Sequence, residues 1–302
     1  MTIYLAEKTL ELIDQAIEKD QGALYRQKLG EVIMEVTDAY DNKPPDFRSH
    51  FGVSTSGRPC ARSLWYNWRW VTQSWFSGRM LRLFNRGHLE EARFVAMLRA
   101  AGITLYQSDE NMRQFRIEMF GGHYGSAIDG VAVGIPDLPD PEMLSLVEFK
   151  THNDKSFKKL QANGVKKSKP EHYAQMVQYI DYWDLDAALY LAVNKNDDTL
   201  YGELIPPSES EATYFRTRSQ KIIFQRNIPP RFSDAPDTFE CRFCDHKMRC
   251  HYQQGEVARN CRTCSESVAL ENGTWVCSAS GEVLDKEAQK RGCEFYNVHS
   301  DL

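Results

Sequence analysis

The sequence predicts an α/β domain that follows N-terminal helices and precedes a small cysteine-rich module. Three observations predict this organisation. Helical and strand-like patterns follow one another in the order helix, three strands, helix, strand, which is typical of an α/β domain. Amphipathic helical patterns come before this stretch, and seven of the eight cysteines come after residue 240. At 302 residues, the chain is long enough for one large domain with an appendage.

The expected elements can be placed along the chain in order. Two helices are expected at about 2–19 and 22–40, ahead of the breaker DNKPPD at 41–46. A loop and an aromatic-rich helix are expected within 56–75, and a longer helix at about 79–101. Three strands are expected at 113–120, 125–135 and 143–150, followed by a lysine-rich loop. The last elements expected are a helix at 170–184 opened by Pro170, strands at 187–195 and 200–205, and a helix at 208–225.

Composition places the chain inside the cell. No apolar run approaches the roughly 18 residues that a membrane span needs, and the N-terminus is amphipathic rather than a secretory signal. We therefore expect a cytoplasmic protein with no membrane partner. Because a reducing compartment disfavours disulfides, the cysteines are expected to bind metal or to take part in catalysis.

The charge is unevenly spread along the chain. The net charge is -5, yet residues 48–99 hold nine Arg and no Lys against Glu90 and Glu91. Residues 150–169 hold seven Lys against Asp154 alone. This division is typical of a basic track on an acidic body, which attracts a polyanion such as DNA. Solvated lysine loops are the alternative.

The stretch MLSLVEFK ends an apolar run with an acid and a lysine two places apart. Side chains alternate along a strand, so Glu148 and Lys150 face one side while Phe149 can enter the core. Alone, such a pair would be an exposed ion pair. Asp129 lies in the preceding strand-like run, beside Gly130, where another chain or a ligand can approach closely. Two carboxylates on adjacent strands are costly to bury unless a cation neutralises them, and their oxygens suit Mg or Mn.

Two neighbouring helices can add polar groups to these acids. His88 could contribute an imidazole from the helix at 79–101, although a lone helical histidine is more often a surface or packed polar residue. Gln175 and Tyr179 are four residues apart in the helix at 170–184, so they share a face. The set His88, AIDG with Asp129, EFK and QMVQY resembles, in order, the motifs of the RecB-type branch of the PD-(D/E)xK nucleases. Gly125 lies slightly farther from the aspartate than in the family pattern.

The resemblance implies a restriction-endonuclease-like core, a mixed central sheet flanked by helices, and a metal-dependent DNA exonuclease. It implies that His88, Asp129, Glu148 and the Phe149 carbonyl hold Mg or Mn, and that Lys150 positions or deprotonates the attacking water. Gln175 and Tyr179 would orient the DNA backbone or the lysine. Glu91 is a further candidate near the metal, with a solvated helix acid as its alternative.

Such an enzyme would act on DNA ends or single strands. The aromatic and arginine side chains of CARSLWYNWRW, residues 60–70, are candidates to stack on a strand, with a core helix as the alternative. The sequence has no GxxxxGK[ST] loop, so a helicase, a recombinase or a single-strand-binding protein is the expected partner. A structure-selective endonuclease and a DNA-binding or assembly module with a vestigial site remain the alternatives.

The cysteines form two groups. Cys241, Cys244 and Cys250 form C-x2-C-x5-C, and Cys60 can supply a fourth thiolate, which suits either zinc or an iron-sulfur cluster. A zinc knuckle completed by His246 or His251 is the alternative. One distant N-terminal cysteine with this C-terminal run also resembles the iron-sulfur RecB-type nucleases, among them the CRISPR adaptation nucleases, AddB and exonuclease V. That resemblance implies a [4Fe-4S] cluster.

The second group lies in the C-terminal tail. Cys261, Cys264, Cys277 and Cys293 are spaced C-x2-C, x12, C, x15, C around the turn ENGTW, which predicts a zinc module, with His299 as a possible replacement for Cys293. The expected domains are therefore an N-terminal helical region at 1–46, a nuclease domain clasped by the cluster at 47–255, and the zinc module at 256–302. The role of the tail is left open between DNA contact, partner docking and stability.

Overall fold

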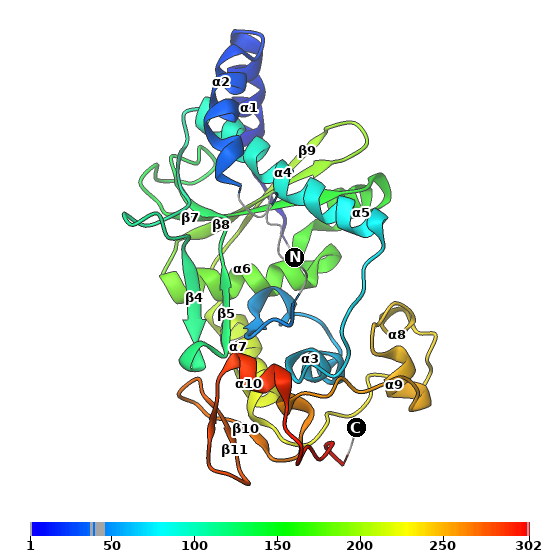
Figure 1. The fold of residues 1–302 in the computed structure, drawn as a ribbon. Coiled ribbons are helices and arrows are strands. Elements are labelled where there is room, and N and C mark those ends of the chain that lie inside the picture. Colours follow the sequence, from blue (N-terminus) through cyan, green and yellow to red (C-terminus); the bar gives the residue numbers. More distant parts are fainter. Residues whose placement is uncertain (1, 37–38, 40–45, 301) are drawn as a thin grey trace. The chain divides into compact units, whose positions relative to one another are not determined.

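The structure is a computed structural model that describes residues 2–36, 39, 46–300 and 302 (Figure 1). It divides into two compact units. The first takes the described residues of Met1–Pro44, Phe76–Ile117 and Ala127–Ala212. The second takes those of Pro45–Trp75, Glu118–Ser126 and Thr213–Leu302. The predicted domain boundaries at residues 46 and 255 stay predictions. None of the described helices is long and apolar enough to cross a bilayer.

A six-stranded mixed sheet forms the centre of the first unit, which confirms the α/β class. Its order is β1-β9-β8-β7-β6-β3. The central pair β7 and β8 is parallel, and the other neighbours are antiparallel. All eight residues of β8 are buried, as expected for a strand covered on both faces. The strands are β1 Tyr4–Leu5, β3 Thr104–Tyr106, β6 Gly130–Val133, β7 Ser145–His152, β8 Ala187–Asn194 and β9 Leu200–Ile205.

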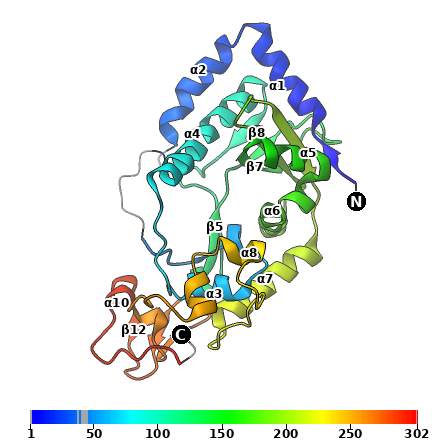
Figure 2. The same ribbon diagram turned by 90° about the vertical axis from the view of Figure 1, so that its right-hand side faces the viewer.

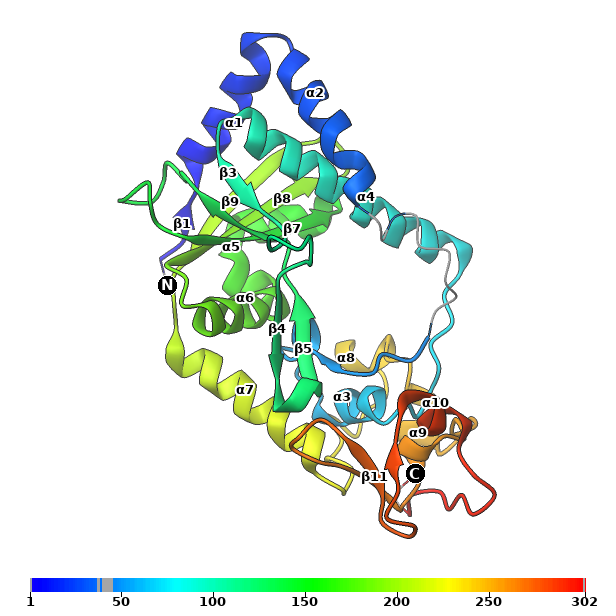
Figure 3. The same ribbon diagram turned by 60° about the vertical axis from the view of Figure 1, so that its left-hand side comes forward.

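Helices cover both faces of this sheet (Figures 2 and 3). On one face, α1, α2 and α4 share a hydrophobic core with apolar residues of β7 and β8, and the ring of Phe94 on α4 stacks on Phe149 at 5.0 Å. On the other face lie α5 and α6, and the ring of Phe157 on α5 packs against Tyr201. The helices are α1 Glu7–Lys19, α2 Ala23–Val32, α4 Gly78–Ala100, α5 Asp154–Ser168 and α6 Pro170–Trp183, and a 3-10 turn, η1 Ile33–Glu35, follows α2.

The remaining elements lie wholly or partly in the second unit. They include two three-stranded sheets, one of order β2-β5-β4 and one of order β10-β11-β12. The strands are β2 Phe51–Gly52, β4 Arg116–Met119, β5 Tyr124–Ala127, β10 Ser267–Ala269, β11 Trp275–Cys277 and β12 Val283–Leu284. The helices are α3 Ala61–Trp68, α7 Glu209–Phe224, α8 Phe239–Arg242, α9 Lys247–Tyr252 and α10 Lys286–Arg291, with 3-10 turns η3 Val53–Thr55, η4 Phe120–Gly122 and η5 Cys261–Thr263.

The lysine-rich loop expected after β7 is wrong, because these residues form α5. Asn153 caps the helix, and its side chain accepts a hydrogen bond from the backbone of Ser156 at 2.9 Å. Phe157 and Leu160 are buried three residues apart on the face toward the sheet. The many lysines occupy the outer face, so they hide the helical period from a composition-based reading.

Three other expected elements differ in their limits. The strand expected at 125–135 is interrupted at Ile128 and Asp129, since β5 ends before them and β6 begins after them. A Cβ atom at Gly130 would lie 2.8 Å from the carbonyl oxygen of Tyr106, so the chain that approaches this glycine is β3. The helix expected at about 2–19 begins only at Glu7, after the edge strand β1. The helix expected at 22–40 ends at Val32, and 37–38 and 40 lie outside the described residues.

The aromatic helix α3 does not offer its rings to a DNA strand, as residues 60–70 were predicted to do. Trp65, Tyr66, Trp68 and Trp70 are each at most 3% exposed, and Arg69 is 2% exposed. The alternative, a core helix, therefore holds. The indole nitrogens of Trp65 and Trp68 donate to the carbonyls of Gln225 and Ile223, which fixes α3 inside the second unit.

Two buried arginines join α3 to the C-terminal segment. The guanidinium of Arg262 lies 3.9 Å from the ring centre of Trp70 and 4.4 Å from that of Trp68, and it donates to the Trp68 carbonyl. It also donates to the Ser49 carbonyl at 2.8 Å. Arg69 donates in turn to the carbonyl of Arg262 at 3.1 Å. These contacts give the C-terminal segment a structural role in the second unit.

Candidate functional site

Two carboxylates on neighbouring segments of the first unit form the centre of the candidate site. Glu148 lies on β7, and Asp129 directly precedes β6, where Gly130 is paired with Val147. Asp129 Oδ2 accepts a hydrogen bond from the backbone N–H of Phe149 at 2.8 Å. Because that N–H belongs to the residue between Glu148 and Lys150, the bond holds Asp129 against the EFK tripeptide.

Glu148 is fully buried and has two side-chain partners. Lys150 Nζ donates to Glu148 Oε1, and Gln175 Nε2 donates to Glu148 Oε2 at 3.1 Å. Lys150 Nζ also donates to the carbonyl oxygen of Phe149 at 3.1 Å. The sheet alternation therefore places Glu148 and Lys150 together, while the ring of Phe149 packs on the opposite face.

Helix α6 supplies a supporting chain of hydrogen bonds. Gln175 Nε2 donates to Tyr179 Oη at 3.1 Å, and Tyr179 Oη donates to the carbonyl of Ala127 at 3.2 Å. Gln175 and Tyr179 are both buried and lie one helical turn apart. The chain runs from Glu148 through Gln175 and Tyr179 to the end of β5, so α6 fixes the orientation of Glu148.

The electrostatics of the pair are unbalanced. The pKa of Glu148 is raised to about 7, because burial and the Asp129 carboxylate together outweigh the opposing effects of Lys150 and Gln175. Desolvation lowers the pKa of Lys150, but Glu148 and Asp129 outweigh it, so the pKa of Lys150 lies above its usual value. One buried and one half-buried acid thus lie around one ammonium group, and a further cation would stabilise them both.

The oxygen atoms at this point fit a divalent cation by their chemistry. Asp129 and Glu148 offer carboxylate oxygens, and Phe149 offers a carbonyl oxygen, which are the hard donors that Mg and Mn prefer. The ammonium of Lys150 contacts two of these residues, Glu148 and Phe149. A positive charge therefore already lies at the oxygens that the sequence assigned to a metal.

The structure does not bring His88 into this cluster. His88 is half-buried on α4 and takes part in none of the hydrogen bonds described above. Among the described residues, no group of three or more His, Cys, Asp or Glu side chains could hold a metal ion as it stands. Glu91, one turn along α4, accepts from Gln107 Nε2 at 3.4 Å, and its charge contributes to the raised pKa of Lys150. The metal role of His88 stays a prediction.

A polar network that the sequence did not reveal adjoins the pair. Tyr190 on β8 is the strand neighbour of Glu148, and its hydroxyl contacts His152 Nε2 at 2.8 Å and His172 Nδ1 at 3.0 Å. Burial lowers the pKa of His152 to about 3 and that of His172 to about 2, and nearby lysines add to both effects. Spacing gave a signal, since His152 shares the strand face of Lys150 and His172 lies three residues before Gln175.

The first cysteine group lines one pocket of the second unit. Cys60, Cys241, Cys244 and Cys250 all contribute to its wall. Cys60 is the N-cap of α3, and Cys244 Sγ contacts Ser63 Oγ at 3.7 Å. Burial raises the pKa of the Cys244 thiol, and the neighbouring Cys60 adds to this. The four thiols are thus gathered by elements far apart in the sequence, and thiolates are the donors that zinc and iron-sulfur clusters use.

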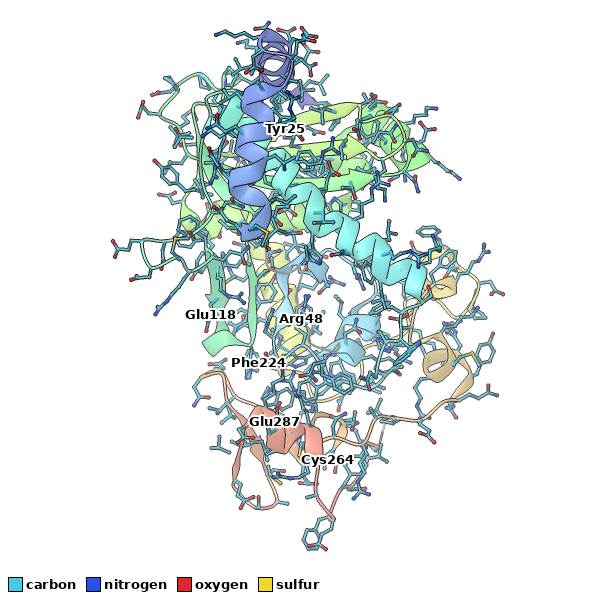
Figure 4. The ribbon with its side chains drawn as sticks, turned by 45° about the horizontal axis from the view of Figure 1, so that its top comes forward. Tyr25, Arg48, Glu118, Phe224, Cys264 and Glu287 are labelled. Carbon is cyan, nitrogen blue, oxygen red and sulfur yellow. The ribbon has the colours of Figure 1, made fainter. Side chains whose placement is uncertain are left out.

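The second cysteine group lies in the C-terminal segment. Burial raises the pKa of the Cys261 thiol, and Cys293, Cys264 and Cys277 each contribute, so all four side chains interact. The predicted turn ENGTW joins β10 to β11, and a Cβ atom at Gly273 would lie 1.8 Å from the Gly121 carbonyl oxygen. Figure 4 labels Cys264 in this segment. The zinc site itself stays a prediction.

Comparisons with known proteins give only distant structural matches. No protein-family model and no curated protein matches the chain. The crystal structure of SSO0001 matches at 16% identity and a TM-score of 0.43, over 77% of this chain and 96% of that one. An alkaline exonuclease, LHK-Exo from Laribacter hongkongensis, matches at 13% identity and a TM-score of 0.40, over 63% and 90%. Its complex with dAMP matches at 14% and 0.38, over 58% and 86%. At these values the matches establish no family for the chain.

Proposed function

We propose that this chain is a Mg- or Mn-dependent deoxyribonuclease of the PD-(D/E)xK type, in its RecB-like branch. One observation carries the proposal. The buried Glu148 and the half-buried Asp129, on neighbouring segments, lie around the single ammonium of Lys150, which does not balance both charges. A buried acid whose pKa is raised by burial and by a neighbouring carboxylate, as that of Glu148 is, is a mark of functional sites.

The residues of this site would have distinct roles in catalysis. Asp129, Glu148 and the Phe149 carbonyl would hold the cation, with His88 as the further ligand that the sequence resemblance assigns. A bound divalent cation polarises the scissile phosphate and acidifies a water. Lys150, whose side chain is 26% exposed, positions that water or removes its proton. Gln175 and Tyr179 keep Glu148 in place during this step.

The substrate that we propose is DNA, attacked from ends or along single strands. The action is that of an exonuclease in recombination, repair or other DNA processing inside the cell. Lacking a motif for ATP-driven unwinding, the enzyme would work on frayed ends or beside a helicase, a recombinase or a single-strand-binding protein.

We further propose that the two cysteine groups bind metal. Cys60, Cys241, Cys244 and Cys250 would ligate a [4Fe-4S] cluster, since they line one pocket. Cys261, Cys264, Cys277 and Cys293 would bind zinc. The cluster would then join Cys60, near the start of the nuclease domain at 47–255, to the cysteines near its end. The zinc module at 256–302 would follow.

The nuclease proposal is tested by replacing the acid and the lysine. Glu148→Gln and Lys150→Met should each lower Mn- or Mg-dependent degradation of end-labelled DNA at least about 100-fold, because general base catalysis alone contributes about that much. The measurement is product release on denaturing gels, with circular dichroism to show that the fold is kept. Lys158→Ala serves as the control, since Lys158 is an exposed lysine of the neighbouring helix α5.

Two results would contradict the proposal. Undiminished cleavage by Glu148→Gln would show that Glu148 takes no part in DNA hydrolysis. A wild-type protein that degrades no DNA with Mg or Mn would favour the DNA-binding module with a vestigial site. Closed circular DNA separates the two modes of action. An exonuclease spares the circle, whereas a structure-selective endonuclease opens it.

The cluster proposal has its own measurement. Protein purified without oxygen should be brown, absorb broadly in the blue part of the visible spectrum, and contain iron and acid-labile sulfide. Cys250→Ser should lose this colour, whereas Cys293→Ser, in the other group, should keep it. A colourless protein that contains only zinc would refute the cluster and favour the zinc alternative.

A further inference from the structure

The first half of α4 exposes apolar side chains that the fold does not use. Leu81, Leu83 and Phe84 are 46%, 36% and 41% exposed. The second half of the same helix is different, because its residues from Glu90 onward are mostly buried against the sheet and α2. Figure 4 labels Tyr25 on α2, whose hydroxyl accepts from Arg93 Nε of α4 at 3.4 Å. A helix of 23 residues therefore has a covered half and an uncovered half.

The uncovered apolar residues continue the buried face of the helix. Met80, Leu83, Phe84 and Gly87 follow the spacing i, i+3, i+4, i+7, and Glu91 and Phe94 extend the same stripe. Phe94 packs on Phe149, whose ring lies on the sheet face opposite Glu148 and Lys150, whereas the charge of Glu91 raises the pKa of Lys150. Glu91 is therefore the residue of this stripe that connects the exposed half of α4 to Lys150 of the EFK tripeptide.

Positive charge accompanies this stripe. Arg79, Arg82 and Arg86 lie on the first half of α4, and residues 75–89 contain no acid. Arg86 is engaged, since it donates to the Lys195 carbonyl at 3.1 Å. Arg79 and Arg82 are exposed and form no ion pair among the described residues. An apolar protein partner would not need these charges, whereas a polyanion would.

Gly87 leaves open space at the end of this exposed half of the helix. A Cβ atom at this position would meet nothing within 4 Å, so packing does not require a glycine there. Glycine in a helix interior costs about 1 kcal/mol relative to alanine. The glycine leaves the helix backbone bare directly before His88 and one turn before Glu91, which permits the close approach of a chain.

We propose that the first half of α4, residues 78–87, binds single-stranded DNA and delivers it to the site of Asp129 and Glu148. The proposal rests on the proposed nuclease function. Bases would stack on Phe84 and on Phe76, whose rings already form an edge contact at 5.1 Å, and phosphates would pair with Arg79 and Arg82. Aromatic and arginine side chains on one surface are typical of proteins that bind single strands.

The test is direct binding of a fluorescein-labelled 20-residue oligo(dT) in EDTA, followed by anisotropy. The double variant Arg82→Ala, Phe84→Ser should bind at least about tenfold more weakly than wild type, because one lost stacking contact is worth about 1–3 kcal/mol. Leu24→Ser, Arg26→Ala on α2 is the matched control, since Leu24 is 38% exposed and Arg26 is also at the surface. The control should bind within twofold of wild type.

The outcomes separate this surface from the nuclease proposal. Wild-type affinity in the α4 variant, or equal losses in variant and control, would overturn the surface whatever the activity of the enzyme. A loss restricted to duplex DNA would overturn its single-strand preference. Glu148→Gln should keep full oligo(dT) affinity, and persistent cleavage by that variant would sink the nuclease proposal without touching the binding result. Equal thermal midpoints for the α4 variant and wild type show that the helix still folds.

Discussion

The two compact units each bury charge, and they do so in opposite ways. In the first unit, Asp129 and Glu148 share the ammonium of Lys150, and burial raises the pKa of Glu148 to about 7. In the second unit, Arg69 and Arg262 are each 2% exposed and form no ion pair among the described residues. Both donate to backbone carbonyls and tryptophan rings cover their faces, and among the described residues Arg69 Nε has no hydrogen-bond partner.

The difference lies in how completely each cluster is satisfied. All three nitrogens of Arg262 donate, to the backbone carbonyls of Trp68 and Ser49 and to the amide oxygen of Gln289, so the hydrogen bonds of this guanidinium are satisfied; we call such a group closed. The carboxylates have a long, flexible side chain as their cation, and that side chain is 26% exposed. A closed group such as Arg262 stabilises the fold. An open group such as Asp129 and Glu148, whose cation is a mobile side chain, can exchange that cation for another. This contrast leads us to expect stability from the arginines and chemistry from the acids.

The largest effect on stability is expected from Arg262. Arg262→Ala should lower the free energy of unfolding by about 4 kcal/mol, because it leaves the Trp68 and Ser49 carbonyls without partners and opens a cavity between the rings. Urea denaturation followed by tryptophan fluorescence measures this. Arg226→Ala is the control, since Arg226 is exposed and donates to a single carbonyl. Equal losses for the two variants would contradict the idea of a closed group.

A smaller effect should appear as the pH falls. The pKa of His152 is lowered to about 3 by burial, below the value of about 6.5 in an unfolded chain. Above pH 6.5 His152 is neutral in both the folded and the unfolded chain and costs no stability. As the pH falls below 6.5, only the unfolded chain binds the proton, so the free energy of unfolding decreases. By pH 5 the neutral His152 should cost the fold about 2 kcal/mol.

The measurement is the free energy of unfolding between pH 8 and pH 5 for wild type and His152→Asn. The variant has no group to protonate at this position, so its curve should fall less steeply by about 2 kcal/mol over this range. Parallel curves would show that His152 does not remain neutral in the fold.

Much of the first unit could be predicted from the sequence, because its patterns are long and regular. The strands β7, β8 and β9 and the helices α4 and α6 lie within a few residues of their expected places. Apolar runs with β-branched residues, a Pro170 start and a Gly102 end each carry their own local signal. Gln175 and Tyr179 could be placed on one face by helical spacing alone.

The rest depends on tertiary contacts that no local pattern encodes. The rings and arginine of CARSLWYNWRW are compatible with a DNA surface and with a core, and only the carbonyls of Gln225 and Ile223 and the distant Arg262 decide for the core. Tyr190 lies in an unbroken apolar run, so nothing in the sequence shows that its hydroxyl joins two histidines. Outward lysines likewise hid α5.

The smallest effect on stability is expected where the largest effect on activity is proposed. Glu148→Gln should change the free energy of unfolding in EDTA by no more than about 1 kcal/mol, or stabilise the fold. The amide keeps the shape and removes a desolvated charge that Asp129 opposes. Glu203→Gln is the matched control in the same sheet. Glu203 is buried but accepts from the Val165 N–H at 2.8 Å and from Tyr201 Oη, so its replacement should cost about 1–2 kcal/mol. Urea denaturation measures both variants. If Glu148→Gln lowers the free energy of unfolding more than Glu203→Gln does, Glu148 stabilises the fold, and the contrast between an open and a closed group is wrong.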